Sequence, residues 1–263
     1  GAQVIQAMLG GDVPLTVTAG PEGVVAKLQG ADIALLTTNN PTMHFSLFVS
    51  PDIKKPEELR GKRAGVSRFG SASDFSMRYI FKSLGLSESD VTIVQIGDNP
   101  SRMAAMKSNA IQATVFTAPN TVRARKAGFR SIVDAYKLGL KFHGSGIAVA
   151  GPFLRERRPV VEQFMRGFLE GVAFAKQHKE ESIRLIMDFM KLKDRDEAEE
   201  TYQVIIQDIQ PRKPYPSKEG VETVLRNIES TIPKAKTVKA EDLIDDSVLR
   251  RIDQSGFIDS LYR

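Results

Sequence analysis

The sequence predicts an α/β protein of two lobes that are joined by two chain crossings. Short helices alternate with short apolar strands over the first half of the chain, and everything beyond residue 150 has helical spacing. Two extended apolar stretches, His44–Val49 and Gly144–Val149, interrupt the alternation. An α/β unit that is entered through one such stretch and left through the other favours a hinge between lobes. The expected lobes are residues 1–47 with 147–263, and residues 48–146.

The first lobe is expected to begin with two helix–strand pairs. Glycine follows each helix, where it can adopt the left-handed conformation that ends helices. Repetition of helix, glycine and buried strand is typical of a mainly parallel sheet. The expected helices are Gln3–Leu9 and Pro21–Gln29, and the expected strands are Leu15–Thr18 and Ile33–Thr37.

The second lobe is expected to follow a polar connector, Pro51–Gly61. In the helix after Ser73, apolar residues recur at i, i+3, i+4 and i+7, so one face of this helix packs on a sheet. The expected strands are Arg63–Ser67, Val91–Ile96, Ile111–Phe116 and Phe129–Val133, and the expected helices are Ala72–Leu84, Ser101–Ser108 and Asn120–Ala127.

The C-terminal part is expected to be helical, with an apolar stripe running from Val161 to Ala175. Ser217 is a suitable N-cap after a proline-rich loop. Further helices are expected near Glu181–Lys191, Arg195–Ile209, Lys218–Ser230 and Glu241–Ile252.

Composition excludes several classes of site. There is no cysteine, which excludes disulfides, thiolate metal sites and cysteine nucleophiles. No metal-binding spacing of histidines or carboxylates is present, and we expect neither metal nor cofactor. The net charge of +5 includes basic clusters at Arg123–Arg130 and Arg155–Arg158. These clusters lack interleaved stacking aromatics, so we interpret them as solvated surface and expect no nucleic-acid partner.

The most informative stretch is GVSRFGSASDF, residues 65–75. A strand ends here and a helix begins, so several backbone N–H groups are expected to be unpaired at the positive end of the helix dipole. The hydroxyls of Ser67, Ser71 and Ser73 add donors. This arrangement predicts a site for a negatively charged group. The alternative, weighed equally, is that Ser71 or Ser73 serves only as the helix N-cap.

Small polar residues also follow other expected strands. Ligands of open parallel sheets lie beyond the carboxyl ends of the strands, so these loops are candidates for a hydrogen-bonding cleft. Taken singly, each is an ordinary turn former. The loops are Thr18-Ala19-Gly20, Thr38-Asn39-Asn40 and Thr117-Ala118-Pro119.

Catalytic patterns are weak. Residues 65–75 lack the three glycines of a dinucleotide fingerprint, and Ser145 lies in a GSG rather than in a hydrolase elbow. His178 is expected in solvent. His44 and His143 flank the two crossings. For each of them, a ligand contact and a structural or solvent-facing role are both alternatives. No nucleophile, base and orienting group come together, so no enzyme is predicted.

At this point the chain resembles a known family, the nitrate/sulfonate/taurine-type periplasmic substrate-binding proteins, which include binders of thiamine-pyrimidine precursors. The resemblance rests on the order and spacing of several segments and covers nearly the whole chain. The segments are PDIKKPEELRGKRAGVSRFGSASD, SLGL, VTIVQIGDNPSRMAAMKSNAIQATVFTAP, FLRERRPVVEQFMRGFLEGVAFAKQHKEES and PRKPYPSKEGVETVL.

The resemblance implies a type II periplasmic-binding fold, a monomer that closes on one small organic ligand, and delivery to an ABC permease outside the cytoplasm. A biosynthetic enzyme on the same fold or a ligand sensor stays an alternative. The resemblance also implies an initial strand–helix–strand before Gln3, so we expect either that the chain is truncated relative to the family or that its first segment is not represented. A cysteine-dependent enzymatic branch is discounted because the chain has no cysteine.

The ligand residues that these arguments and the resemblance suggest lie in both lobes. Arg68 is open to either a ligand contact or a solvent-facing position. The candidates are Thr18, Ala19, Gly20, Thr38, Asn39, Ser67, Arg68, Phe69, Gly70, Ser71, Ser73, Thr117, Ala118, Pro119, His143 and Ser145.

Overall fold

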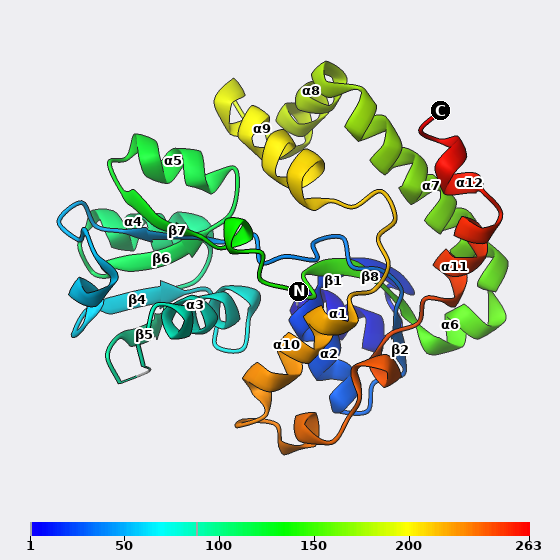
Figure 1. The fold of residues 1–263 in the computed structure, drawn as a ribbon, viewed down its shortest axis with the longest axis horizontal. Coiled ribbons are helices and arrows are strands. Elements are labelled where there is room, and N and C mark those ends of the chain that lie inside the picture. Colours follow the sequence, from blue (N-terminus) through cyan, green and yellow to red (C-terminus); the bar gives the residue numbers. More distant parts are fainter. Residues whose placement is uncertain (1, 88) are drawn as a thin grey trace.

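The computed structural model describes residues 2–87 and 89–263, which form two sheets with helices around them (Figure 1). One sheet has three strands in the order β1-β8-β2, and the other has five in the order β5-β4-β6-β3-β7. The prediction of an α/β protein with two lobes is therefore confirmed.

The three-stranded sheet holds the first lobe together. Its strands are β1 (Leu15–Ala19), β2 (Ile33–Leu35) and, between them, β8 (Ser145–Ala150), which runs antiparallel to both. The mainly parallel sheet expected from the helix–strand repeat is therefore wrong for this lobe, because the returning strand β8 separates the two parallel strands. Helices α1 (Ala2–Leu9), α2 (Gly20–Leu28) and α10 (Lys218–Ile228) belong to this lobe.

The five-stranded sheet forms the second lobe. β4 (Arg63–Val66) pairs in parallel with β5 (Thr92–Gln95) and β6 (Ala113–Phe116). β3 (Ser46–Val49) is antiparallel to β6 and to β7 (Arg130–Asp134). β3 begins where β6 and β7 end, because it brings the chain in from the first lobe. The helices are α3 (Ala72–Ser83), α4 (Asn99–Lys107) and α5 (Asn120–Lys126).

Two connections join the lobes, one before β3 and one before β8. They lie side by side: Thr42 and Lys141 form an antiparallel bridge, and the Phe142 amide donates to the Pro41 carbonyl at 2.9 Å. A short 3₁₀ turn, Ala135–Leu138, begins the second connection. The two predicted crossings are confirmed.

The C-terminal helices pack mainly on the first lobe. Apolar residues of α7 (Arg158–Gln177) and α11 (Ser247–Gln254) form one core cluster with β2 and β8. The other elements are α6 (Gly151–Glu156), α8 (Lys179–Met190), α9 (Arg195–Thr201), its π-helical continuation η3 (Tyr202–Ile209), α12 (Phe257–Ser260), and 3₁₀ turns at Pro56–Leu59, Pro233–Lys236 and Ala240–Leu243.

The single helix expected at Glu241–Ile252 is wrong. A 3₁₀ turn and α11 flank an extended break, in which Ile244 bridges to Leu35 and the Asp245 amide donates to the Leu35 carbonyl at 3.0 Å. The break provides hydrogen-bond partners for backbone groups of the edge strand β2. This gain outweighs the preference of the sequence for a continuous helix.

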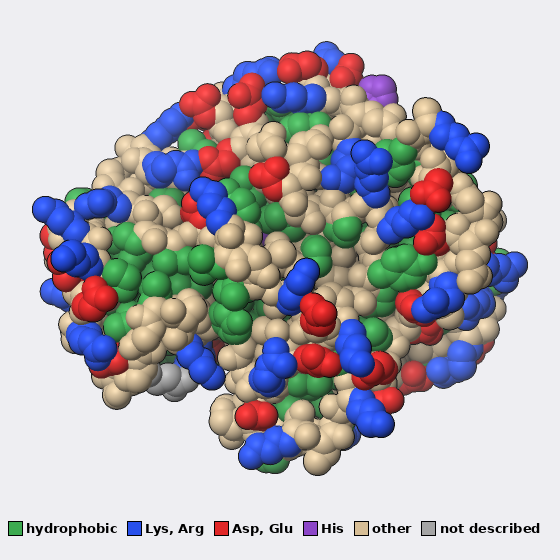
Figure 2. Space-filling model, in the orientation of Figure 1, with side chains coloured by type: hydrophobic (Ala, Val, Ile, Leu, Met, Phe, Trp, Pro, Cys, Tyr) green, Lys and Arg blue, Asp and Glu red, His purple; other side chains and the backbone are tan. Residues whose placement is uncertain are grey.

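Helix α9 also contacts the second lobe through α5. Arg123 pairs with Glu197 at 2.7 Å, Lys126 pairs with Asp196 at 3.0 Å, and Arg125 pairs with Glu200. The basic cluster of α5 is thus used in ion pairs between the lobes. Elsewhere on the face shown in Figure 2, basic and acidic side chains are interspersed.

Candidate functional site

One edge of the five-stranded sheet presents the functional candidates of the second lobe. The register places the end of β6 (Phe116), the start of β3 (Ser46) and the end of β7 (Asp134) side by side at this edge. β4 and β5 end at the same edge, because they run parallel to β6. The loops that follow β4 and β6 and both interlobe connections therefore meet here.

The loop from Ser67 to Ser73, which we call the serine loop, brings three hydroxyls together. Ser67 Oγ lies 2.9 Å from both Ser71 Oγ and Ser73 Oγ, which lie 3.0 Å apart. Ser73 is buried and the other two are half-buried, whereas Arg68 and Phe69 are exposed. Because each hydroxyl can rotate its hydrogen toward a new acceptor, the cluster can donate to an incoming oxygen anion.

Several backbone amides of the serine loop are paired within the protein, contrary to the expectation. The Gly70 amide donates to Asp74 Oδ2 at 2.8 Å, and the Phe69 amide donates to Gln95 Oε1 at 3.2 Å. Ser71 is the N-cap of α3, as the alternative interpretation held. The first turn of α3 thus supplies a carboxylate, that of Asp74, to an amide of the loop that precedes it. The prediction of unpaired amides is therefore wrong for this conformation.

A carboxylate from the first lobe reaches the same helix start. Glu22, in the first turn of α2, has its Oε2 atom buried without a hydrogen-bond partner. Burial raises the pKa of Glu22, and the backbone N–H of Ala72 partly opposes that rise. An acidic side chain thus lies at the place where the sequence predicts a ligand's negative group.

Thr38, Asn39 and His143 are brought together at the connections, where they are 0%, 5% and 1% exposed. Thr38 Oγ1 lies 2.6 Å from His143 Nδ1 and accepts from the Ser217 amide at 2.8 Å. The Asn39 amide donates to the Ser145 carbonyl at 2.7 Å. These contacts tie both connections to the start of α10, so Thr38 Oγ1, His143 Nδ1 and the Asn39 backbone amide are engaged within the protein.

The start of α2, which follows β1 directly, approaches the second connection closely. Gly20 is buried, and a Cβ atom there would lie 1.9 Å from the His143 carbonyl oxygen, so only glycine fits. Thr18 and Ala19 belong to β1, but their side chains lie outside what the structure describes.

A cavity of about 540 Å³ lies between the edge of the second lobe and the C-terminal helices. Of the predicted residues, Ala118 lines it, while Thr117 is half-buried and Pro119 is buried beside it. The lining residues are His44, Ser46, Ala118, Thr121, Arg125, Asp134, Tyr136, Lys137, Lys179, Asp196, Glu199, Glu200, Gln203, Val204 and Asp208.

The lining of this cavity is polar, and several of its charges are paired. Lys137 Nζ lies 2.8 Å from Asp134 Oδ2, and Thr121 and Arg125 both contact Glu200. Burial lowers the pKa of His44 to about 4, so its imidazole is neutral at physiological pH. The cavity can therefore hold a small polar ligand through neutral donors and paired charges.

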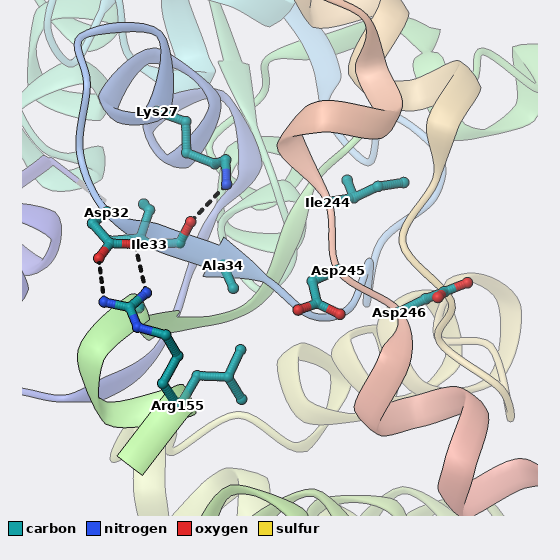
Figure 3. Close-up of a pocket in the computed structure, with 10 residues that line it drawn as sticks. Lys27, Asp32, Ile33, Ala34, Arg155, Ile244, Asp245 and Asp246 are labelled. Carbon is teal, nitrogen blue, oxygen red and sulfur yellow. Dashed lines mark hydrogen bonds and ion pairs between the residues drawn. The ribbon is translucent and has the colours of Figure 1, made fainter. Parts of the chain in front are cut away.

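A second cavity, of about 410 Å³, lies at the outer edge of β2 (Figure 3). None of the predicted residues lines it. Its two basic side chains have partners within the lining: Lys27 Nζ donates to the Ile33 carbonyl at 2.7 Å, and Arg155 pairs with Asp32 at 2.8 Å. We therefore place the candidate site at the interlobe cavity and the serine loop.

Within the described ranges, no group of histidines and carboxylates has the geometry to hold a metal ion. A search of the same residues finds no helix with the length and apolarity to cross a bilayer.

Sequence reasoning missed the contributions of the C-terminal helices, including Lys179, Glu199 and Gln203. Their position at the cavity depends on how α8, α9 and η3 pack against the second lobe, and helical spacing carries no signal for that. Glu22 was missed for the same reason.

Solved structures similar to this chain have the same fold. The periplasmic aliphatic sulphonate binding protein SsuA from Escherichia coli superposes with a TM-score of 0.76 at 19% identity, covering 93% of this chain and 79% of that one. The alkanesulfonate-binding protein SsuA from Xanthomonas axonopodis pv. citri, bound to MOPS, gives 0.73 at 18% identity, covering 91% and 82%. The periplasmic-binding-protein fold is therefore confirmed.

A curated relative is the riboflavin-binding protein RibY of Chloroflexus aurantiacus, which is 25% identical over 186 residues. The match covers 68% of this chain, but the chain spans only about half of the relative, 51% of its length.

The family model described as NMT1/THI5 like matches residues 1–182 of the 263. That match takes in both sheets, both connections and the serine loop, and it agrees with the resemblance seen in the sequence. With the fold of the solved relatives, it shows that the chain belongs to the NMT1/THI5-like family.

Proposed function

We propose that this protein is the solute-binding component of an ABC importer, which closes its two lobes on one small organic ligand and passes it to the permease. The ligand carries an anionic group, such as a sulfonate or a carboxylate. The protein acts outside the cytoplasm, and binding involves no chemical conversion.

The observation that carries this proposal is the cavity of about 540 Å³ between the second lobe and the C-terminal helices. Clefts between lobes joined by two connections are common sites for small ligands. The clustered hydroxyls of the serine loop support an anionic ligand, and so do the names of the two SsuA proteins. In the proposed bound state, the ligand's anion replaces the Glu22 carboxylate at the start of α3.

A ligand panel tests the function. We expect one class among sulfonates (including MOPS), carboxylates, nitrate, pyrimidines and riboflavin to stabilise the protein. At 100 times its Kd, the ligand raises the free energy of unfolding by about 2.7 kcal/mol, which shifts the melting temperature by about 5–10 °C. Thermal shift and calorimetry measure this, and mass spectrometry should recover the ligand unchanged.

The outcomes of the panel separate the alternatives. A response to riboflavin alone would contradict the anionic ligand but keep solute binding. No response to any class would contradict solute binding itself. A new product mass would favour an enzyme.

Replacing Ser67 by alanine tests the serine loop. The change removes a hydroxyl that contacts both other serines but leaves the N-cap Ser71 in place. A hydrogen bond to a charged group contributes about 1.5–3 kcal/mol, so affinity for the anionic ligand should fall at least about tenfold. Ser108→Ala, at the exposed end of α4, is the control, and equal affinities of the two variants would exclude the serine loop.

A further inference from the structure

Arg102 carries a buried positive charge that no carboxylate among the described residues pairs with. Its side chain is 4% exposed. Nη1 donates to the Val115 carbonyl at 2.6 Å and to Thr114 Oγ1 at 3.2 Å, and Nη2 donates to Asn99 Oδ1. All three acceptors are neutral, and the buried Nε atom has no hydrogen-bond partner.

This guanidinium stays charged at neutral pH. Burial lowers the pKa of Arg102 to about 10, and Asp98 opposes that change. Asp98 itself is exposed, and its Oδ1 accepts from the Ser101 amide at 2.9 Å as the N-cap of α4. A buried charge without a paired opposite charge is costly, so its presence requires an explanation.

The position of Arg102 connects it to the candidate site. Thr114 Oγ1, which accepts from Arg102, donates in turn to the Gly65 carbonyl of β4 at 2.7 Å. The serine loop starts two residues after Gly65, and the Thr117 loop starts two residues after Val115. The charge is therefore held directly behind the ends of the two strands whose loops form the site.

We propose that Arg102 determines ligand specificity, its charge favouring ligands that carry a negative group at the serine loop. This inference rests on the proposed function. Arg102 acts as a positioning residue through space and through Thr114, without touching the ligand, because Nη1 and Nη2 donate to protein acceptors and the remaining donor, Nε, is buried. Because the guanidinium is buried and poorly solvated, its attraction for a negative group at the serine loop is screened less than it would be in water.

The test compares MOPS, a probe that carries a negative sulfonate group, with riboflavin, a probe that carries no charge. Arg102→Gln in the full chain should weaken MOPS binding about tenfold, equivalent to about 1.4 kcal/mol, and leave riboflavin binding unchanged. Arg102→Lys keeps the charge and should stay within about threefold of wild type for MOPS. Lys107→Gln, on the exposed end of α4, is the control. Calorimetry gives each Kd.

A second pair of variants leaves Arg102 in place and offsets its positive charge with a neighbouring carboxylate. Thr114→Asp places a carboxylate beside the guanidinium and should weaken MOPS binding about tenfold relative to Thr114→Asn. This pair decides the question if Arg102→Gln does not fold.

Three results would overturn the inference without contradicting solute binding. The first is that Arg102→Gln binds MOPS as tightly as the wild type does, and Thr114→Asp as tightly as Thr114→Asn. The second is that both probes are lost equally, with no rescue by lysine, which indicates a structural role. The third is that the wild type binds riboflavin but not MOPS, which leaves solute binding intact. A wild type that binds neither probe contradicts the proposed function, and the inference falls with it.

Discussion

Gly220→Ala is expected to lower the free energy of unfolding by about 2–4 kcal/mol. Gly220 lies in the first turn of α10, and a Cβ atom there would lie 2.4 Å from the Phe142 carbonyl carbon and 2.5 Å from the His143 nitrogen. Both contacts are with backbone, which cannot rotate away as a side chain can. The helix must shift from the second connection, and the strain outweighs the gain of about 1 kcal/mol in helix propensity. Urea unfolding measures the loss.

Gly171→Ala is the matched control, with the opposite sign. Gly171 lies in α7, and a Cβ atom there would meet nothing within 4 Å. Alanine should therefore stabilise the protein by about 0.5–1 kcal/mol. If Gly220→Ala were also stabilising, the close packing of α10 on the connection would be wrong.

Gly220→Ala should also weaken ligand binding at the candidate site. The start of α10 holds the first connection as well, through the Ser217 amide and Thr38 Oγ1. A shifted α10 disturbs both connections, so we expect weaker affinity for the bound panel ligand than Gly171→Ala shows. This result would separate a role in lobe closure from a role in stability alone.

Most elements of the fold could be predicted, because they depend on local signals. Glycine after each early helix and apolar runs of strand length predicted α2, β2 and their neighbours within one or two residues. Strand direction could not be predicted in this way. β3 and β8 are antiparallel because they carry the chain between lobes, and that path is a property of the whole fold.

The candidate site could be predicted only where it is local. The hydroxyl cluster spans Ser67 to Ser73, so its parts are close in sequence. The approach of Glu22 depends on how the lobes meet, which no spacing encodes. Arg102 did carry a signal, since it shares a face of α4 with the buried Met106 four residues on. A charged residue on a packed face is a candidate for function.

Lowering the pH from about 6.5 to 4 is expected to destabilise the protein through His143. Burial lowers the pKa of His143 to about 4 from its ordinary value of 6.5. Between these values the unfolded chain binds a proton that the folded protein does not, so the free energy of unfolding falls as the pH falls. One proton corresponds to about 1.4 kcal/mol per pH unit, or about 3 kcal/mol over the window. Above pH 6.5 this contribution is constant.

His143→Asn isolates the effect, because asparagine can still meet Thr38 Oγ1 but does not titrate. The variant should lose about one proton equivalent of slope when urea unfolding is followed from pH 4 to 7.5. Ser108→Ala, at the exposed end of α4, changes no titratable group and should keep the wild-type slope. An unchanged slope in His143→Asn would mean that the imidazole accepts a proton within the fold. The connections would then open to water more readily than their packing indicates, and His143 would return as a candidate ligand contact.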